Sequence, residues 1–296
     1  MKWENTLIAL YLHICGHKDM ANHIKELRMS NNHRPRFTDE ELMTVYLFGL
    51  SKNLRSQKDI YQYCRDHLLS WFPTLPSYQA FNARLNQLAS CFEFLIDDMC
   101  QTAHIQLQGV HEVVLDSMPI IVAGNSRSSR ATVAKDICSK GYCSSKQMYY
   151  YGVKLHLMGS IRPKRIPMPR NIWYTEAHIN DLNAARPVID KLYNAKIYAD
   201  KAYCDEDLKN KLALQNTEII TPIKASKGQF LRDSAAELYS TAVSKVRQPI
   251  ESLFNWLIEK TDIQAANKVR SSKGLAIHIL GRLTLACLYF IQFFNP

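Results

Sequence analysis

The chain has 296 residues, of which 47% are hydrophobic and 22% are charged. This composition is that of a folded globular protein, and it excludes collagen-like, coiled-coil and disordered chains. With roughly 100 to 200 residues per domain, the length predicts two domains. The 37 Lys and Arg residues exceed the 27 Asp and Glu residues and give a net charge of +10, which is typical of proteins that bind a polyanion.

The excess positive charge is concentrated in residues 121–170. This segment carries ten basic side chains and one acid, Asp136, whereas residues 1–100 carry eleven of each sign. A solvated surface would explain a single basic side chain, but contacts with nucleic-acid phosphates explain such a cluster better. Arg162, Lys164 and Arg165 are the members of this segment that we single out as candidate DNA contacts.

Cysteine usage and the apolar stretches both indicate a cytoplasmic protein without a membrane partner. The eight cysteines include no Cys-x-x-Cys pair, so neither a zinc ribbon nor a thioredoxin-like site is predicted, and free thiols in a reducing compartment are expected. Residues 6–15 are too short to span a bilayer, and residues 274–294 are interrupted by His278, Arg282 and Gln292. Both stretches are expected to be buried helices.

Residues 1–104 are predicted to form an all-helical domain. Thr38, with Glu41 three residues later, forms a capping box before an apolar run, and Ser56 starts a further helix. Ser77 is expected to open a third helix that continues to Phe92.

The third predicted helix has a polar face that carries Gln79, Asn82, Arg84 and Asn86. Short helices that end in such a helix fit either a helix-turn-helix, whose last helix enters the major groove of DNA, or a plain helical bundle. Amide side chains and Arg read the edges of adenine and guanine. Gln79, Asn82 and Arg84 are therefore candidate base contacts in a domain that binds DNA ends.

From residue 111 the pattern changes to short β-branched and alternating runs, which predict strands near 111–116, 151–158, 171–175, 196–200 and 218–223. Helices are expected around residues 182–192 and 208–212, and a long closing helix from about Lys245. The order of three strands followed by alternating helices and strands predicts an α/β domain over residues 105–296, with a mixed sheet flanked by crossover helices.

Two aspartates follow short apolar strands: Asp116 ends VVLD and Asp200 ends IYAD. In open α/β sheets, ligands bind at such carboxyl ends. Glu251 borders the apolar stripe of the closing helix and shares one face with Arg247 and Asn255. Each carboxylate alone has a plain structural explanation, as a turn former or as the ion-pair partner of Arg247, but their joint pattern favours a cluster of three carboxylates.

Three carboxylates held together repel one another unless cations lie between them, and carboxylate oxygens select hard cations such as Mg²⁺ or Mn²⁺. Two such ions about 4 Å apart can promote an in-line phosphoryl displacement. The sequence therefore predicts a site for two divalent ions beside a surface that binds DNA.

The segments VVLDSMPI, IYADKAY and VRQPIESLFNWL together resemble the three signature blocks of DDE transposases from bacterial insertion sequences, most closely the 982 group. The blocks occur in the family's order, their acids are 84 and 51 positions apart, and the resemblance covers essentially the whole chain. It implies a ribonuclease-H-like fold and a catalytic, metal-binding triad of Asp116, Asp200 and Glu251. It also implies cleavage at terminal inverted repeats, attack of the freed 3′ hydroxyl on target DNA, and a dimer on the DNA.

The closing helix departs from related groups, which place Tyr before the Arg and Lys seven residues after the Glu. Ser244 and Ile258 occupy those positions here, and Lys260 falls on the opposite face. Lys201 and Arg247 are therefore the better candidates for contacting DNA near the scissile phosphate.

Two alternatives to an active transposase remain from the sequence. One is a catalytically inactive DNA-binding regulator on the same scaffold, and the other is a structure-selective nuclease without strand transfer.

Overall fold

The computed structural model describes residues 3–28, 35–106, 111–144, 146–223, 233–291 and 293. The chain divides into two compact units. Unit 1 comprises Met1–Met99, Thr132–Asp136 and Ile258–Pro296, and unit 2 comprises Cys100–Ala131 and Ile137–Leu257.

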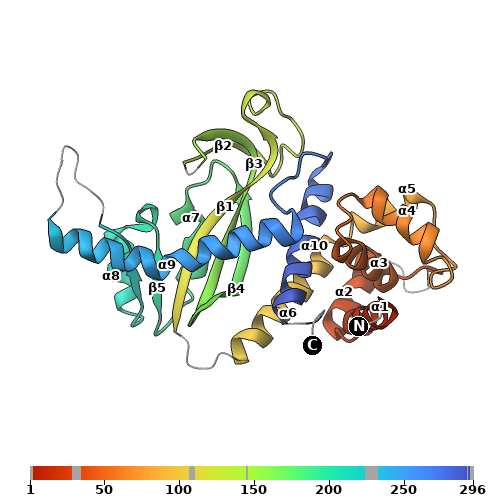
Figure 1. Cartoon of the computed structure of the whole chain (residues 1–296), viewed down its shortest axis with the longest axis horizontal. Coiled ribbons are helices and arrows are strands. Elements are labelled where there is room, and N and C mark those ends of the chain that lie inside the picture. The colour runs from red at the N-terminus through yellow and green to blue at the C-terminus, as the bar shows by residue number, and fades with distance from the viewer. Residues whose placement is uncertain are drawn as a thin grey trace. The chain divides into compact units, whose positions relative to one another are not determined.

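Unit 1 is helical (Figure 1). Its helices are α1 (Trp3–Cys15), α2 (Lys18–Arg28), α3 (Asp39–Ser51), α4 (Gln57–His67), α5 (Tyr78–Leu85), the first part of α6 (Ala89–Gln106), and α10 (Ser272–Phe290). The predicted caps are confirmed: Thr38 and Glu41 form a capping box on α3, and Ser56 and Ser77 cap α4 and α5.

The helix predicted from Ser77 to Phe92 is two helices, α5 and α6, separated by residues 86–88. Phe81, Leu85, Leu88 and Phe92 are all fully buried, as the apolar spacing indicates. The amide of Asn86, which caps α5, bonds to the side chains of Asn82 and Gln57. Both bonds join side chains and connect the end of α5 to α4, and the apolar period continues into α6 although the helix stops.

Helix α10 belongs to unit 1, whereas the sequence-based division assigned it to the second domain. The reason is its close fit against α3: a Cβ added at Gly281 would collide with the ring of Tyr46, whose hydroxyl donates to the Ile277 carbonyl. By length and composition α10 could span a membrane, yet 72% of its apolar window is buried. It packs as the core helix of this unit.

Unit 2 is a six-stranded mixed sheet with the path β2-β3-β1-β5-β6, in which β4 also pairs with β3. The strands are β1 (Glu112–Gly124), β2 (Ser139–Cys143), β3 (Met148–Arg162), β4 (Arg165–Glu176), β5 (Lys196–Ala199) and β6 (Glu218–Ile220). Strand β1 pairs antiparallel with β3 and parallel with β5. The predicted α/β class is confirmed, and β2 is a strand that the sequence pattern did not indicate.

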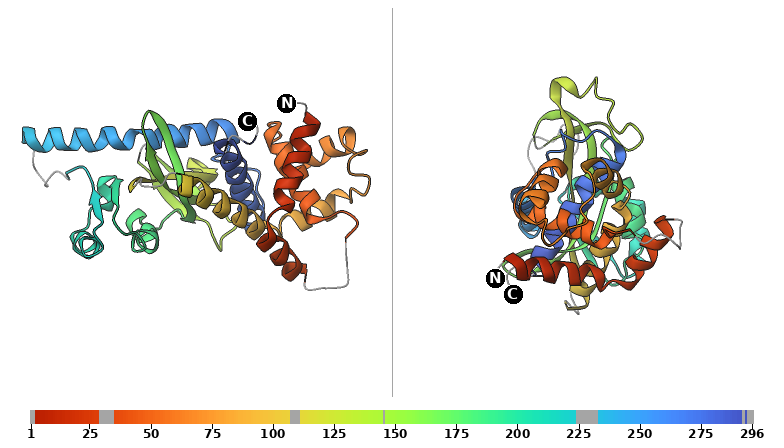
Figure 2. Two further views of the ribbon diagram at one scale, coloured as in Figure 1. Left: turned by 90° about the horizontal axis from the view of Figure 1, so that it is seen from below. Right: turned by 90° about the vertical axis from the view of Figure 1, so that its right-hand side faces the viewer.

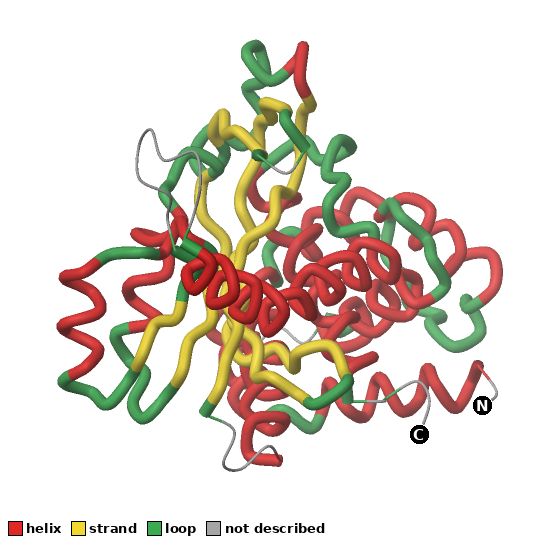
Figure 3. The backbone as a smooth tube through the Cα atoms, turned by 60° about the vertical axis from the view of Figure 1, so that its left-hand side comes forward, coloured by secondary structure: helices red, strands yellow, loops and turns green. Residues whose placement is uncertain are grey.

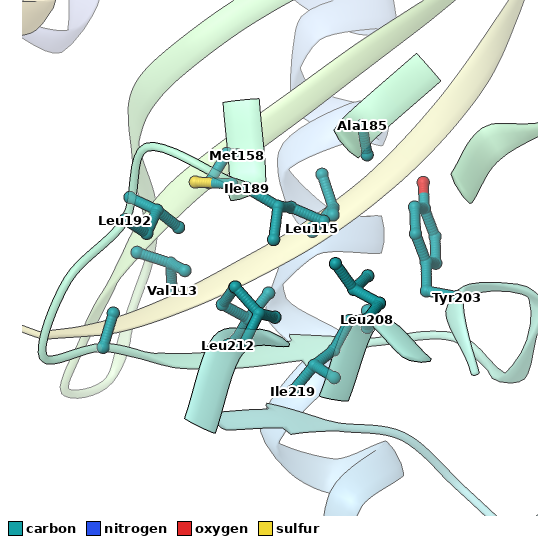
Figure 4. Close-up of a cluster of buried hydrophobic side chains, with 13 residues drawn as sticks. Val113, Leu115, Met158, Ala185, Ile189, Leu192, Tyr203, Leu208, Leu212 and Ile219 are labelled. Atoms are coloured by element: carbon teal, nitrogen blue, oxygen red, sulfur yellow. The ribbon is translucent and has the colours of Figure 1, made fainter. Parts of the chain in front are cut away.

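Helices cover both faces of this sheet (Figures 2 and 3). Helices α7 (Asp181–Ile189) and α8 (Glu206–Ala213) pack on one face through an apolar cluster that includes Leu115, Ile197 and Leu212 (Figure 4). The long helix α9 (Ser234–Thr261) crosses the other face and begins 11 residues before the predicted start at Lys245. Its buried stripe includes Ile250, Leu253 and Leu257, as the sequence indicates.

Candidate active site

The parallel pairing of β1 with β5 places Asp116 and Asp200 side by side. Leu115 is in register with Ala199, and each aspartate is the next residue along its strand direction. Strand β5 ends at Ala199, one residue before the predicted end, but β1 does not end at Asp116; it runs on to Gly124 because β3 continues to pair with it. Asp116 therefore lies where the parallel pairing stops.

Side-chain alternation determines which face the two carboxylates occupy. Leu115 and Ala199 belong to the apolar cluster beneath α7 and α8. Because successive strand residues point to opposite faces, Asp116 and Asp200 are directed away from that cluster. Helix α9 crosses the face on that side (Figure 3). Arg247 of α9 meets them there.

Arg247 is the cation shared by the two carboxylates. Its Nη2 lies 3.0 Å from Asp116 Oδ2, and its Nη1 lies 3.9 Å from Asp200 Oδ1. The Arg247 side chain is 12% exposed, and its Nε is buried without a hydrogen-bond partner. One guanidinium thus faces two carboxylates at this point of the sheet.

The environment of Asp116 disfavours its ionised form. The pKa of Asp116 is raised to about 6, mainly by burial and also by the negative charges of Asp200 and Asp181, against the opposing effects of Arg247 and the Ser117 N–H. Two carboxylates face one guanidinium here, so the site is short of positive charge. That shortage, together with hard oxygen donors, fits a divalent cation held by Asp116 and Asp200.

Glu251 does not complete a closed cluster with these two residues. It lies on α9 one turn after Arg247 and is exposed. Among the residues that the structure describes, no group of three Asp, Glu, His or Cys side chains has the spacing of a metal site. The structure brings together two of the three predicted carboxylates, and the triad stays a prediction.

Asp181 is a carboxylate near Asp116 that the sequence pattern did not indicate, and it lies with Ser117 on the opposite face of β1. It begins α7, and its Oδ1 accepts hydrogen bonds from Ser117 Oγ at 3.1 Å and from Lys154 Nζ at 2.9 Å. Lys154 also donates to the carbonyl of Ile179 at 2.6 Å. The available signal was Asn180, a helix cap followed at once by an acid, four residues after the end of β4. From sequence, that segment was predicted only as an amphipathic helix.

The other predicted DNA contacts fall in different places. Lys201 is exposed beside Asp200. Arg162 donates twice to the Ile166 carbonyl, and Lys164 and Arg165 are exposed at the turn between β3 and β4. Because Val113 pairs with Ser160, this turn lies near the start of β1, away from Asp116. The basic segment is thus spread over both ends of the sheet.

Two cavities of unit 2 lie at opposite ends of the sheet. The larger, of about 970 Å³, is lined by acids and bases together, including Glu112, Lys196 and Glu218, at the strand starts. A cavity of about 570 Å³ lies beside Lys154 and Asp181. The exposed rings of Tyr142 and Tyr149 line it together with Lys140, whose Nζ is 4.7 Å from the centre of the Tyr149 ring. The lining of the second cavity includes Asp181 but not Asp116, Asp200 or Arg247.

A mixed sheet with two adjacent carboxylates on its central strands, a long helix on one face and crossover helices on the other is a ribonuclease-H-like fold. The family model described as "Transposase DDE domain" matches residues 106–271, more than half of the chain. The chain therefore belongs to the DDE transposase domain family, whose members are enzymes that act on DNA and typically use divalent metal ions. No curated protein and no solved structure matches it.

Proposed function

We propose that this chain is the transposase of a bacterial insertion sequence, of the group that its signature blocks resemble. It would cleave DNA at terminal inverted repeats and join the freed 3′ hydroxyl to target DNA. The observation that supports this most strongly is the juxtaposition of Asp116 and Asp200 at the end of the β1–β5 pairing.

In this proposal Asp116, Asp200 and Glu251 are the catalytic residues and the ligands of two Mg²⁺ or Mn²⁺ ions. The ions would activate the attacking oxygen and stabilise charge at the scissile phosphate. Asp181, which Ser117 and Lys154 contact on the opposite face of β1, would act on the site through its negative charge. Arg247 and Lys201 would contact the DNA near that phosphate.

The other proposed roles concern how the protein holds the two DNA ends that it joins. Arg162, Lys164 and Arg165 would contact the DNA backbone, and Gln79 and Asn82 would contact bases of the terminal repeat. The protein would act as a dimer on DNA, in the cytoplasm and at the nucleoid. No membrane takes part.

The test is a pair of assays on DNA that carries the repeats flanking the coding region. Supercoiled plasmid is incubated with protein and Mn²⁺ to detect nicking, and pre-cleaved ends are incubated with target plasmid to detect joining. We expect both products. Nicking without joining would support a nuclease instead, and specific binding without either product would support a regulator.

A further inference from the structure

Unit 1 contains a small groove, of about 280 Å³, formed by α4, α5, the segment before α10, and α10 itself. Its lining contains five Lys or Arg side chains and no carboxylate. The basic residues are Arg55, Lys58, Lys268, Arg270 and Arg282. The groove is thus a concentration of positive charge outside the candidate active site.

Most of this charge is not neutralised within unit 1. Arg55 pairs with Asp262 at 3.3 Å. Lys58, Lys268 and Arg270 are exposed, and over the described ranges no ion pair involves them. Arg270 Nη1 donates only to carbonyls of its own segment, those of Asn267 and Val269. Lys58, Lys268 and Arg270 can therefore bind an external anion.

Arg282 adds a buried charge at the same groove. Its side chain is 3% exposed and donates to the carbonyls of Thr261, Arg55 and His278. No carboxylate pairs with it in the part of the chain that the structure describes. A buried guanidinium held only by carbonyl dipoles keeps its full charge, and its field acts in a medium of low dielectric constant.

Two helix starts reinforce the positive potential. Ser56, the cap of α4, and Ser271, the cap of α10, both line the groove. The N-terminal ends of helices carry partial positive charge and favour anions such as phosphate. These contributions add to the five side chains but would not define a site without them.

We propose that this groove binds a phosphate of the DNA backbone, and that residues 268–271 supply one side of it. The inference rests on the proposed function, which requires DNA as the substrate. A groove of this volume with a cationic lining admits a phosphate group. Asn82 also lines it, so a phosphate held here would bring α5 next to the duplex.

This assignment changes which parts of the chain bind DNA. From sequence, binding of DNA ends was predicted for residues 1–104 alone. Lys268 and Arg270 lie at the end of the range that the transposase family model matches, and Arg282 follows that range. Residues 46–86 and 268–282, which both belong to unit 1, line the same groove. Positively charged side chains from either part should then have similar effects on DNA affinity.

The test uses the full-length protein with two duplexes of equal length, one carrying the terminal repeat and one scrambled. Binding of wild type and of the K268A/R270A double variant is measured by fluorescence anisotropy over a range of KCl concentrations. We expect weaker binding of both duplexes and a salt slope smaller by nearly one unit for each phosphate that the variant no longer binds. Lys58→Ala should act in the same direction from the α4 side.

The matched control is the K25A/R65A double variant, which removes two exposed charges of unit 1 that do not line the groove. It should keep the wild-type slope. An unchanged slope in K268A/R270A, with wild type binding normally, would overturn the groove assignment and leave the proposed function standing. Failure of wild type to bind either duplex would instead overturn the proposed function.

A second measurement separates backbone phosphate from a free anion. Wild type is titrated with inorganic phosphate and with a nucleoside triphosphate in the absence of DNA. Tight binding of either one, abolished in K268A/R270A without any change in DNA affinity, would overturn the assignment to DNA. Weak or no binding of both, with the reduced DNA slope, supports it.

Discussion

Arg84 and Asp39, which are 45 positions apart, form a two-point ion pair inside unit 1. Arg84 Nε and Nη2 lie 2.8 Å and 2.7 Å from the two carboxylate oxygens of Asp39, whose side chain is 1% exposed. Arg28 binds the same carboxylate, and Arg84 Nη1 donates to Gln87. The Arg84 side chain, which was predicted to contact DNA bases, thus holds α5 against α3.

Replacing Arg84 with Ala should therefore lower stability rather than sequence preference. The change removes two hydrogen bonds to the buried Asp39 carboxylate and leaves it with Arg28 alone, which costs roughly 1.5 to 3 kcal/mol. Chemical denaturation of R84A measures the loss, and the Gln79→Ala variant, at an exposed position of the same helix, is the control. An R84A protein of wild-type stability that binds the terminal repeat poorly would restore the base-reading role.

This pair shows what the sequence could and could not supply for unit 1. Caps at Thr38, Ser56 and Ser77 depend on neighbouring residues, and sequence alone predicted them. The use of Arg84 depends on a contact with α3, a different segment, and no local pattern reveals it. The polar face of a helix does not indicate whether it faces DNA or the rest of the protein.

The same distinction applies to the candidate site. The apolar runs before Asp116 and Asp200 predicted both strands, and their parallel register then brings the acids together. Asp181 and Lys154 could not be placed from sequence, because their contact requires α7 to begin beside β3. The position of Glu251 on α9 was predicted by helical spacing, but its exposure was not.

Gly152 marks the closest approach of β1 and β3. A Cβ at this position would collide with the carbonyl of Ile120, next to the irregular register at Ile121. Gly152→Ala should therefore destabilise unit 2 by roughly 1 to 3 kcal/mol, the range for overpacking. Gly124→Ala is the control, since its Cβ would meet only Met148 at 3.7 Å. Thermal unfolding of both variants provides the comparison, and equal melting temperatures would contradict the prediction.

Because His278 is buried, we expect unit 1 to lose stability in acid. The pKa of His278 is lowered to about 3, mainly by burial and also by the charge of Arg282, against the hydrogen bond to the Ile263 carbonyl. In the unfolded chain the ring takes up a proton near pH 6.5, so the unfolded state binds more protons below that pH. Stability should fall by up to about 1.4 kcal/mol per pH unit from this residue as the pH drops from 6 to 4.

Denaturant unfolding at several pH values measures this slope. His278→Gln should reduce the slope, since Gln has no proton to gain. Leu283→Val, a buried change in the same helix, should lower stability at every pH and leave the slope as it is. Identical slopes for wild type and H278Q would rule out this source of acid sensitivity.

Variants in the turn between β3 and β4 test whether the basic segment contributes to DNA binding. Replacing Arg162, Lys164 and Arg165 together with Ala should weaken binding to all DNA sequences and reduce the salt slope by nearly one unit for each phosphate that is no longer bound. Arg162 also bonds to Ile166 within the turn, so K164A/R165A is the variant that removes only exposed charge. An unchanged slope in K164A/R165A would mean that these two side chains are only solvated.

The central claim is that Asp116 and Asp200, adjacent across β1 and β5, form the metal-dependent catalytic site. The most direct measurement is Mn²⁺-dependent cleavage of terminal-repeat DNA by Asp200→Asn, with DNA binding measured in parallel. We predict that D200N loses cleavage and keeps binding, as do D116N and E251Q, while E237Q, at an exposed position of α9, cleaves normally. Cleavage by D200N at the wild-type rate would contradict the claim.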